Sequence, residues 1–167
     1  SRGLGDVYKR QRTSRKYFEG RDVYIGAGTV KKKEEIDVLS DMGVPYILTP
    51  GFDEQIVRYA LEKKIEVLPG VLTPSEVQAA VNCGIHLAKL FPADAFSDRY
   101  IKALKGPFPE MDYVAVGGVT PENAVNFYRL GYKGVAAGSN LVPKHAKRSD
   151  LKKIRETARK YVEVSQI

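Results

Sequence analysis

From residue 23 onward the sequence repeats one unit: a short apolar segment, a turn containing Gly, Pro or Thr, and an amphipathic segment. Short apolar runs bounded by turn residues predict buried strands, and apolar residues spaced three to four apart predict helices. We predict strands at 23–25, 46–49, 66–68, 86–91, 113–116 and 134–137. We predict helices at 33–42, 53–63, 74–82, 98–104, 121–130 and 150–164.

Capping residues support these helix boundaries. Thr73 and Thr120 each precede a proline, so the threonine can cap the helix while the proline takes its first position. Gly43, Gly84 and Gly131 follow predicted helix ends, where glycine readily adopts a positive φ.

Strict alternation of strands and helices predicts a parallel sheet with right-handed crossovers. Such a sheet is either open and doubly wound or closed into a (β/α)8 barrel. The pairs Gly117-Gly118 and Gly138-Ser139 after the last two strands, and a lysine on the predicted lumen side of a strand, favour the barrel. Because a barrel needs eight units and six are visible, we predict an α/β protein with a (β/α)8 TIM barrel that lacks its first two β-α units.

Residues 1–11 show no hydrophobic periodicity. We interpret them as a non-native or unassigned arm, and residues 12–167 as the partial barrel. The native chain would then begin near Arg12, inside the second helix of the barrel.

The charge distribution argues against nucleic acid as a partner. The net charge is +7, but the basic excess lies in residues 1–22 and 144–167, and the body between them is slightly acidic. Nucleic-acid modules normally carry a basic face with interleaved aromatic residues. A basic non-catalytic binding module is therefore the less favoured alternative.

Composition limits cofactors and location. The single cysteine, Cys83, cannot form an intramolecular disulfide, which fits a reducing cytoplasm. With only His86 and His145 besides, we expect no zinc site. No apolar run approaches the length of a membrane span.

Lys89 is the main candidate for chemistry. It lies in the apolar run 85–92, and period-two alternation places Leu87 and Phe91 on its own face. Desolvation disfavours the ammonium form, which lowers the pKa and leaves an amine able to attack a carbonyl. The alternative is a lysine at a strand end whose stem packs while its ammonium reaches water.

Glycine pairs mark a candidate anion site. Gly117 and Gly118 precede the helix that Thr120 caps, and Gly138 and Ser139 follow the final strand. Free N–H groups at such loops bind phosphate in barrels. A single glycine pair would indicate only a tight turn.

These residues carry a family resemblance. The segments that match are, in order, Ile25-Gly26-Ala27-Gly28-Thr29-Val30, Thr49-Pro50-Gly51, Leu68-Pro69-Gly70-Val71, Lys89-Leu90-Phe91-Pro92-Ala93, Lys105-Gly106-Pro107-Phe108-Pro109, Gly117-Gly118-Val119 and Gly138-Ser139-Asn140-Leu141-Val142. Together they resemble the class I pyruvate aldolases that cleave 2-keto-3-deoxy-6-phosphogluconate (KDPG) or 4-hydroxy-2-oxoglutarate (KHG).

The resemblance implies roles for individual residues. Lys89 would form a Schiff base with pyruvate, Phe91 would pack beside it, and Thr29 and Pro50 would line the pyruvate end. The residues that would bind the distal phosphate or carboxylate are Gly117, Gly118 and Ser139. The products would be pyruvate and an aldehyde, either glyceraldehyde 3-phosphate or glyoxylate. Members are homotrimers that use no metal and no other cofactor.

The sequence departs from the family at two places. The general acid/base glutamate and the carboxylate-binding arginine belong to the second strand, which this chain does not contain, so we expect the fragment itself to be nearly inactive. Val116 stands where the family usually has threonine before Gly117. Another phosphate-binding barrel enzyme, such as an isomerase or a thiamine-phosphate synthase-like protein, is the alternative within barrels.

Overall fold

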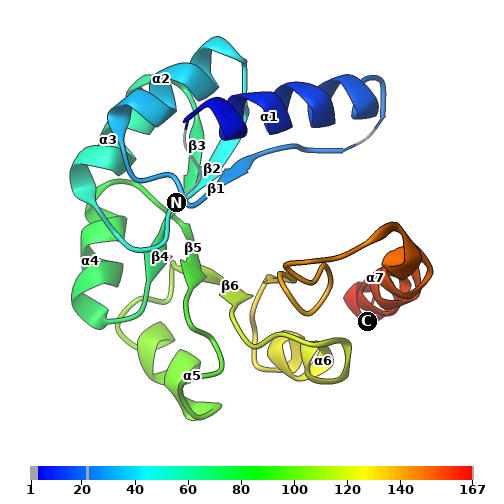
Figure 1. The fold of residues 1–167 in the computed structure, drawn as a ribbon. Coiled ribbons are helices and arrows are strands. Elements are labelled where there is room, and N and C mark those ends of the chain that lie inside the picture. Colours follow the sequence, from blue (N-terminus) through cyan, green and yellow to red (C-terminus); the bar gives the residue numbers. More distant parts are fainter. Residues whose placement is uncertain (1–3, 22, 167) are drawn as a thin grey trace. The chain divides into compact units, whose positions relative to one another are not determined.

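The computed structural model describes residues 4–21 and 23–166, in which helices alternate with parallel strands (Figure 1). The chain forms two compact units, one of residues up to 70 together with 79–85, the other of residues 71–78 together with 86 onward. Helix α4 (Pro74–Asn82) contributes to both. This is the α/β architecture that the alternation predicts, although the described strands form two sheets.

The first unit contains a parallel three-stranded sheet in the order β1 (Ala27–Gly28), β2 (Tyr46–Leu48) and β3 (Glu66–Leu68). Helices α1 (Leu4–Phe18), α2 (Lys33–Asp41) and α3 (Glu54–Glu62) belong to the same unit. The fully buried core of this unit includes Ile36, Leu39, Ile47 and Val57. These apolar positions recur at helical spacing in α2 and α3, which explains why both helices pack.

The second unit contains a sheet in the order β4 (Gly70–Val71), β5 (Leu87–Leu90), β6 (Asp112–Val116) and β7 (Gly134–Ala136). Its helices are α5 (Arg99–Lys105), α6 (Pro121–Arg129), the 3-10 turn η1 (Arg148–Asp150) and α7 (Leu151–Ser165). Helix α6 begins with the predicted cap, since Thr120 accepts a hydrogen bond from Asn123 N and Asn123 Oδ1 accepts one from Thr120 N.

The six predicted helices of residues 33–164 all form, with ends shifted by one residue at most. Gly43, Gly84 and Gly131 have φ values of 64°, 77° and 96°, so the predicted helix stops are confirmed. Five of the six predicted strands also form.

The strand predicted at 23–25 is wrong, because those residues are irregular and β1 lies at Ala27–Gly28. The register gives the reason. Ala27 pairs with Ile47, one residue after β2 begins, so residues 23–25 lie upstream of β2 and have no strand to pair with in the described sheet.

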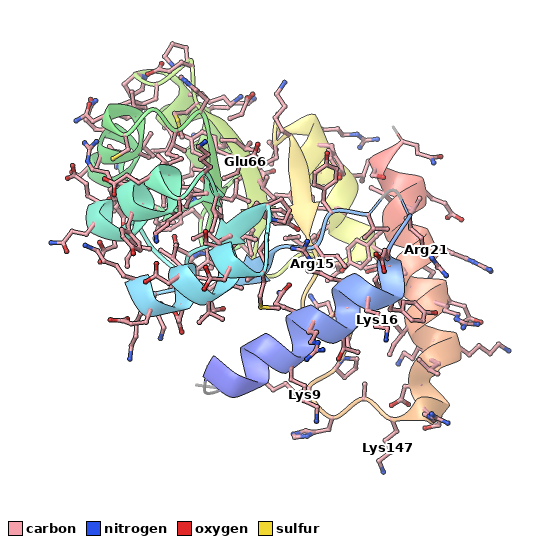
Figure 2. The ribbon with its side chains drawn as sticks, turned by 90° about the horizontal axis from the view of Figure 1, so that it is seen from above. Lys9, Arg15, Lys16, Arg21, Glu66 and Lys147 are labelled. Atoms are coloured by element: carbon pink, nitrogen blue, oxygen red, sulfur yellow. The ribbon has the colours of Figure 1, made fainter. Side chains whose placement is uncertain are left out.

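Part of the predicted arm is helical. Residues 4–11 form the first half of α1, where the sequence shows no apolar periodicity, and residues 1–3 lie outside the described residues. Figure 2 shows Lys9, Arg15 and Lys16 along this helix and Arg21 just after it. Gln11, in the described part of the arm, donates a hydrogen bond from Nε2 to Gly26 O, directly before β1, at 3.0 Å.

Within the described residues, no helix is both long and apolar enough to cross a membrane.

Candidate active site

Lys89 lies near the carboxyl end of β5, paired in register with Val114 of β6. Val114 in turn pairs with Gly134 of β7, so these three residues form one row across the sheet. The opposite face is the packed one, since Ala88, Leu90 and Tyr113 are almost fully buried. Lys89 therefore projects from the less buried face of the sheet.

The surroundings of Lys89 lower its pKa because burial desolvates the ammonium group. The direction is the predicted one, but the burial is less complete than the apolar run suggested. Leu87 is 40% exposed and Phe91 is 41% exposed, so the lysine is only half-buried. Among the residues that the structure describes, no carboxylate forms an ion pair with its Nζ.

Phe91 packs beside the lysine as predicted. The Lys89 Nζ lies 4.3 Å from the centroid of the Phe91 ring. The negative face of an aromatic ring attracts a cation, so this contact favours the ammonium and opposes the desolvation.

The loop after β6 reaches the segment that follows Lys89. A β-carbon at Gly117 would lie 3.2 Å from Pro92 Cα and 3.3 Å from Phe91 Cδ2, and the φ of Gly117 is 98°. Ala93 N donates to Val116 O at 2.9 Å. The ends of β5 and β6 are thus in contact. The positive φ favours glycine at position 117, where a β-carbon would also be tightly packed.

A shared hydrogen-bond acceptor links this loop to the loop after β7. Val119 O accepts from Asn140 Nδ2 at 2.8 Å and from the buried Tyr161 hydroxyl of α7 at 2.9 Å. Asn140 directly follows Ser139, whose side chain is exposed. Loops 117–119 and 138–140, which carry the residues predicted to bind the anion, are therefore joined by the hydrogen bond from Asn140 to Val119.

Thr29 and Pro50 lie in the first unit, at the ends of β1 and β2. Thr29 has a φ of 64°, a left-handed conformation that is costly for a β-branched residue and is often found at functional sites. Pro50 lines a pocket of about 250 Å³ together with Val30 and Thr49. The buried Thr49 hydroxyl donates to Gly51 O at 2.7 Å, which fixes this loop.

A larger pocket of the first unit, about 520 Å³, is not at this end of the strands. Its lining includes Val23, Tyr24, Gly43 and Pro45, which precede β1 and β2. In parallel α/β folds, chemistry gathers at the carboxyl ends of strands. The lining of this pocket also includes the basic residues Arg15, Lys16 and Arg21. The pocket therefore lies at the amino end of the sheet, away from the expected site of chemistry.

Cys83 and the histidines do not form a competing centre. Burial raises the pKa of the half-buried Cys83 thiol, which makes the thiolate scarcer. Within the described part of the chain, no group of three His, Cys, Asp or Glu residues could hold a metal ion.

Sequence reasoning missed three residues of this region: Asp94, Asn140 and Tyr161. Asp94 packs against Gly118, and the other two hold Val119. Asn140 lay inside a matching segment, but nothing in its spacing indicated a hydrogen bond to a residue 21 positions away.

Comparison with known proteins identifies the family. The family model described as KDPG and KHG aldolase matches residues 12–157. The chain belongs to the KDPG and KHG aldolase family. A 2-dehydro-3-deoxy-6-phosphogalactonate aldolase from Escherichia coli K12 is 42% identical over 73% of this chain and 60% of its own length. A 2-dehydro-3-deoxy-phosphogluconate aldolase from Pseudomonas aeruginosa is 32% identical over 72% of this chain and 55% of its own length.

Solved structures of the family share the fold. A structure described as native KDPGal has a TM-score of 0.80 at 33% identity, covering 94% of this chain and 76% of that one. A designed protein cage built by fusing symmetric oligomeric domains has a TM-score of 0.83 at 32% identity, covering 96% of this chain and 57% of that one. A thiamine phosphate pyrophosphorylase from Pyrococcus furiosus has a TM-score of 0.76 at 14% identity, which shows the fold alone.

The chain spans about 55–60% of the length of these two curated relatives.

Proposed function

We propose that the protein of which this chain forms at least a part is a class I aldolase, with Lys89 as its Schiff-base residue. The observation that supports this most is the half-buried amine of Lys89, desolvated and without a paired carboxylate among the described residues, at the carboxyl end of a parallel strand. A lysine in that state supplies the neutral amine that attack on a ketone requires.

The reaction follows from the amine. The nitrogen lone pair of Lys89 attacks C2 of a 2-keto acid, and loss of water leaves a protonated imine. The electrons of the C3–C4 bond flow into this cation while a base takes the proton of the C4 hydroxyl, which gives an enamine and an aldehyde. A proton added to C3 and water added to the imine then release pyruvate and free Lys89.

We assign no residue of this chain as the base that takes the proton of the C4 hydroxyl. General acid–base catalysis contributes about 10²–10⁴-fold to such steps. We therefore expect the chain of residues 1–167 to form the imine with pyruvate but to turn over substrate very slowly. We assign residues 12–167 to the barrel and residues 1–11 to an arm.

The distal end of the substrate would bind at the joined loops. Gly117, Gly118 and Ser139 provide N–H groups and a hydroxyl for a phosphate or carboxylate, while Thr29 and Pro50 would line the pyruvate end. We propose a 2-keto-3-deoxy-6-phospho sugar acid as the substrate. Support comes from the names of the relatives. A relative named for 2-dehydro-3-deoxy-6-phosphogalactonate is 42% identical to this chain, and two relatives named for the phosphogluconate compound are 31–32% identical.

Val116 bears on the same choice. Val114 of β6 is paired with Lys89, and Val116 lies two residues further along the same strand. Val116 therefore lies on the same face of the sheet as Lys89. A methyl group in place of a hydroxyl removes one hydrogen-bond partner next to the substrate chain. We expect Val116 to contribute to discrimination between epimers of the sugar acid.

Assembly is also a proposal. We propose a cytoplasmic homotrimer for the full-length protein, and the similarity to a cage built from symmetric oligomeric domains fits an oligomer.

Borohydride trapping tests the proposed function. Incubation with pyruvate and borohydride should reduce one imine per chain, and peptide mapping should place the adduct on Lys89. An exposed lysine has a pKa near ~10.4 and is almost wholly protonated at neutral pH, so it reacts far less. Lys89→Arg should abolish trapping, since a guanidinium stays charged and cannot form the imine.

Lys152→Arg is the matched control, because Lys152 is an exposed lysine of the same unit. It should leave the yield unchanged. An adduct spread over surface lysines, or none at all in wild type, would overturn the Schiff-base assignment.

A further inference from the structure

Asp94 occupies a place that the proposed reaction does not use. It follows Lys89 by five residues, in the segment that Ala93 N anchors to Val116 O. A β-carbon built at Gly118 would overlap the Asp94 side chain, from Cβ to the carboxylate. Gly118 itself has a φ of 66°. The carboxylate thus rests directly against the α-carbon of the loop proposed to bind the distal anion.

This carboxylate has no partner within the part of the chain that the structure describes. Its side chain is exposed, and no hydrogen bond or ion pair there involves it. Asp98, four residues later, differs, because both of its oxygens lie 3.4 Å from Asn126 Nδ2. An ionised carboxylate only accepts hydrogen bonds, so Asp94 can take protons from a ligand without breaking a contact of its own.

Its position lies between two parts of the site. Phe91 and Pro92 touch Gly117 on one side, towards Lys89, and Asp94 touches Gly118 on the other. A keto acid held by Lys89 through C2 and by the loop through its far anion would pass its middle carbons along this segment. In a 6-phospho sugar acid those carbons carry hydroxyl groups.

We propose that Asp94 is a specificity-determining residue that accepts a hydrogen bond from the hydroxyl next to the terminal phosphate. This inference rests on the proposed binding of the distal anion at Gly117–Gly118. The ligand class it selects is a hydroxylated phosphate monoester. A bare anion gains nothing from Asp94, because two like charges at this spacing repel one another.

The proposed hydrogen bond should strengthen binding of a hydroxylated phosphate ester, whereas charge repulsion should weaken binding of a bare phosphate. Ligands with and without the hydroxyl therefore distinguish the two effects. The probes are glycerol 3-phosphate, n-propyl phosphate and inorganic phosphate, titrated by calorimetry or amide NMR against the complete chain. Wild type should bind glycerol 3-phosphate more tightly than n-propyl phosphate by about three- to tenfold, since hydrogen bonds to charged groups contribute measurably even at the surface.

Asp94→Asn should reduce that preference, because an amide oxygen accepts a hydrogen bond less strongly than a carboxylate does. The same variant should bind inorganic phosphate more tightly, by about fivefold at low salt. That factor corresponds to ~1 kcal/mol for two unit charges about 4 Å apart in water. The gain should shrink as salt rises. Asp98→Asn is the matched control and should change neither ratio. Because both carboxylates are exposed, neither variant removes a buried contact.

The outcomes separate the two proposals. If both esters bind wild type equally, or if Asp94→Asn leaves their ratio unchanged, Asp94 is not the determinant although the anion site stands. If no phosphate ligand binds at all, the anion site itself is wrong and this inference fails with it. Borohydride trapping of pyruvate at Lys89 should be the same in wild type and Asp94→Asn, which confirms that the variant is folded.

Discussion

Two opposing influences act on the amine of Lys89. Burial removes water from the ammonium and lowers the pKa, whereas the Phe91 ring, 4.3 Å from Nζ, attracts the cation. Burial is the cause of the lowered pKa of Lys89. The ring contact acts in the opposite direction, because it stabilises the ammonium form.

This balance predicts how imine formation depends on pH. Trapping of pyruvate should rise with pH and reach half its maximum at a lower pH than for an exposed lysine, because less alkali is needed to deprotonate a desolvated amine. Phe91→Leu keeps an apolar side chain but removes the ring. A cation–π contact contributes about 0.5–1 kcal/mol at exposed sites, so trapping below the midpoint should rise about two- to fivefold.

Measurement of the trapping rate from mildly acidic to alkaline pH checks this prediction. Phe96→Leu, which alters another exposed phenylalanine of the same unit, is the control and should leave the profile in place. A profile for Phe91→Leu shifted to higher pH would show that the ring contributes mainly by excluding water.

Tyr161 connects the last helix to the proposed anion site. Its hydroxyl is buried and donates to Val119 O at 2.9 Å, and Asn140 donates to the same oxygen. Helix α7 thereby fixes the loop that follows β6, although the two lie 42 residues apart in sequence. The position of the loops proposed to bind the anion thus depends on an element outside the sheet.

Tyr161→Phe tests this connection. The ring keeps its packing and Asn140 still satisfies Val119 O, so the cost in unfolding free energy should be about 0.5–1.5 kcal/mol. Affinity for phosphate should fall as the loop loosens, while trapping at Lys89 should persist. Urea unfolding and phosphate titration measure the two effects. Tyr128→Phe, on α6, is the control; an equal loss of phosphate affinity in both variants would show that Tyr161 has no special role.

The local elements were predictable because their signals are local. Thr120 and the glycines after helices 33–42 and 121–130 mark ends within a few residues of themselves, and the structure confirms these ends. The strand predicted at 23–25 failed because pairing with β2, not apolar content, decides where a strand begins. The hydrogen bond of Tyr161 and the contact of Asp94 with Gly118 could not be predicted, since both join residues more than twenty positions apart.

At the scale of the whole molecule, the family and the parallel α/β arrangement followed from the order of motifs at the strand ends. Burial around Lys89 did not follow, because alternation along one strand says which residues share a face but not how deeply that face is covered. The structure leaves Leu87 and Phe91 about two-fifths exposed. The distribution of charge along the chain likewise says little about the site, since Arg15 and Lys16 of α1 line a pocket with residues that precede β1 and β2.

The proposed boundary between an arm and a barrel can be tested by trimming. Removing residues 1–10 should leave the unfolding free energy nearly unchanged, because it spares Gln11, which donates the hydrogen bond to Gly26 O. Removing residues 1–11 should cost about 0.5–1.5 kcal/mol more, the usual contribution of one hydrogen bond. The loss should lie near the lower end of this range, because the buried Gln11 Oε1 has no partner among the described residues. The cost of burying this oxygen unpaired offsets part of the stabilisation that the Nε2 hydrogen bond provides.

Gln11→Ala in the untrimmed chain is the matched control and should reproduce the difference between the two truncations. Urea unfolding measures all four proteins, and borohydride trapping at Lys89 should be equal in each, since Gln11 and Lys89 belong to different units. A loss of several kcal/mol on removal of residues 1–10 alone would contradict the prediction. In that case α1 would be part of the folded barrel from its first turn, because only packing against the rest of the chain could account for so large an effect.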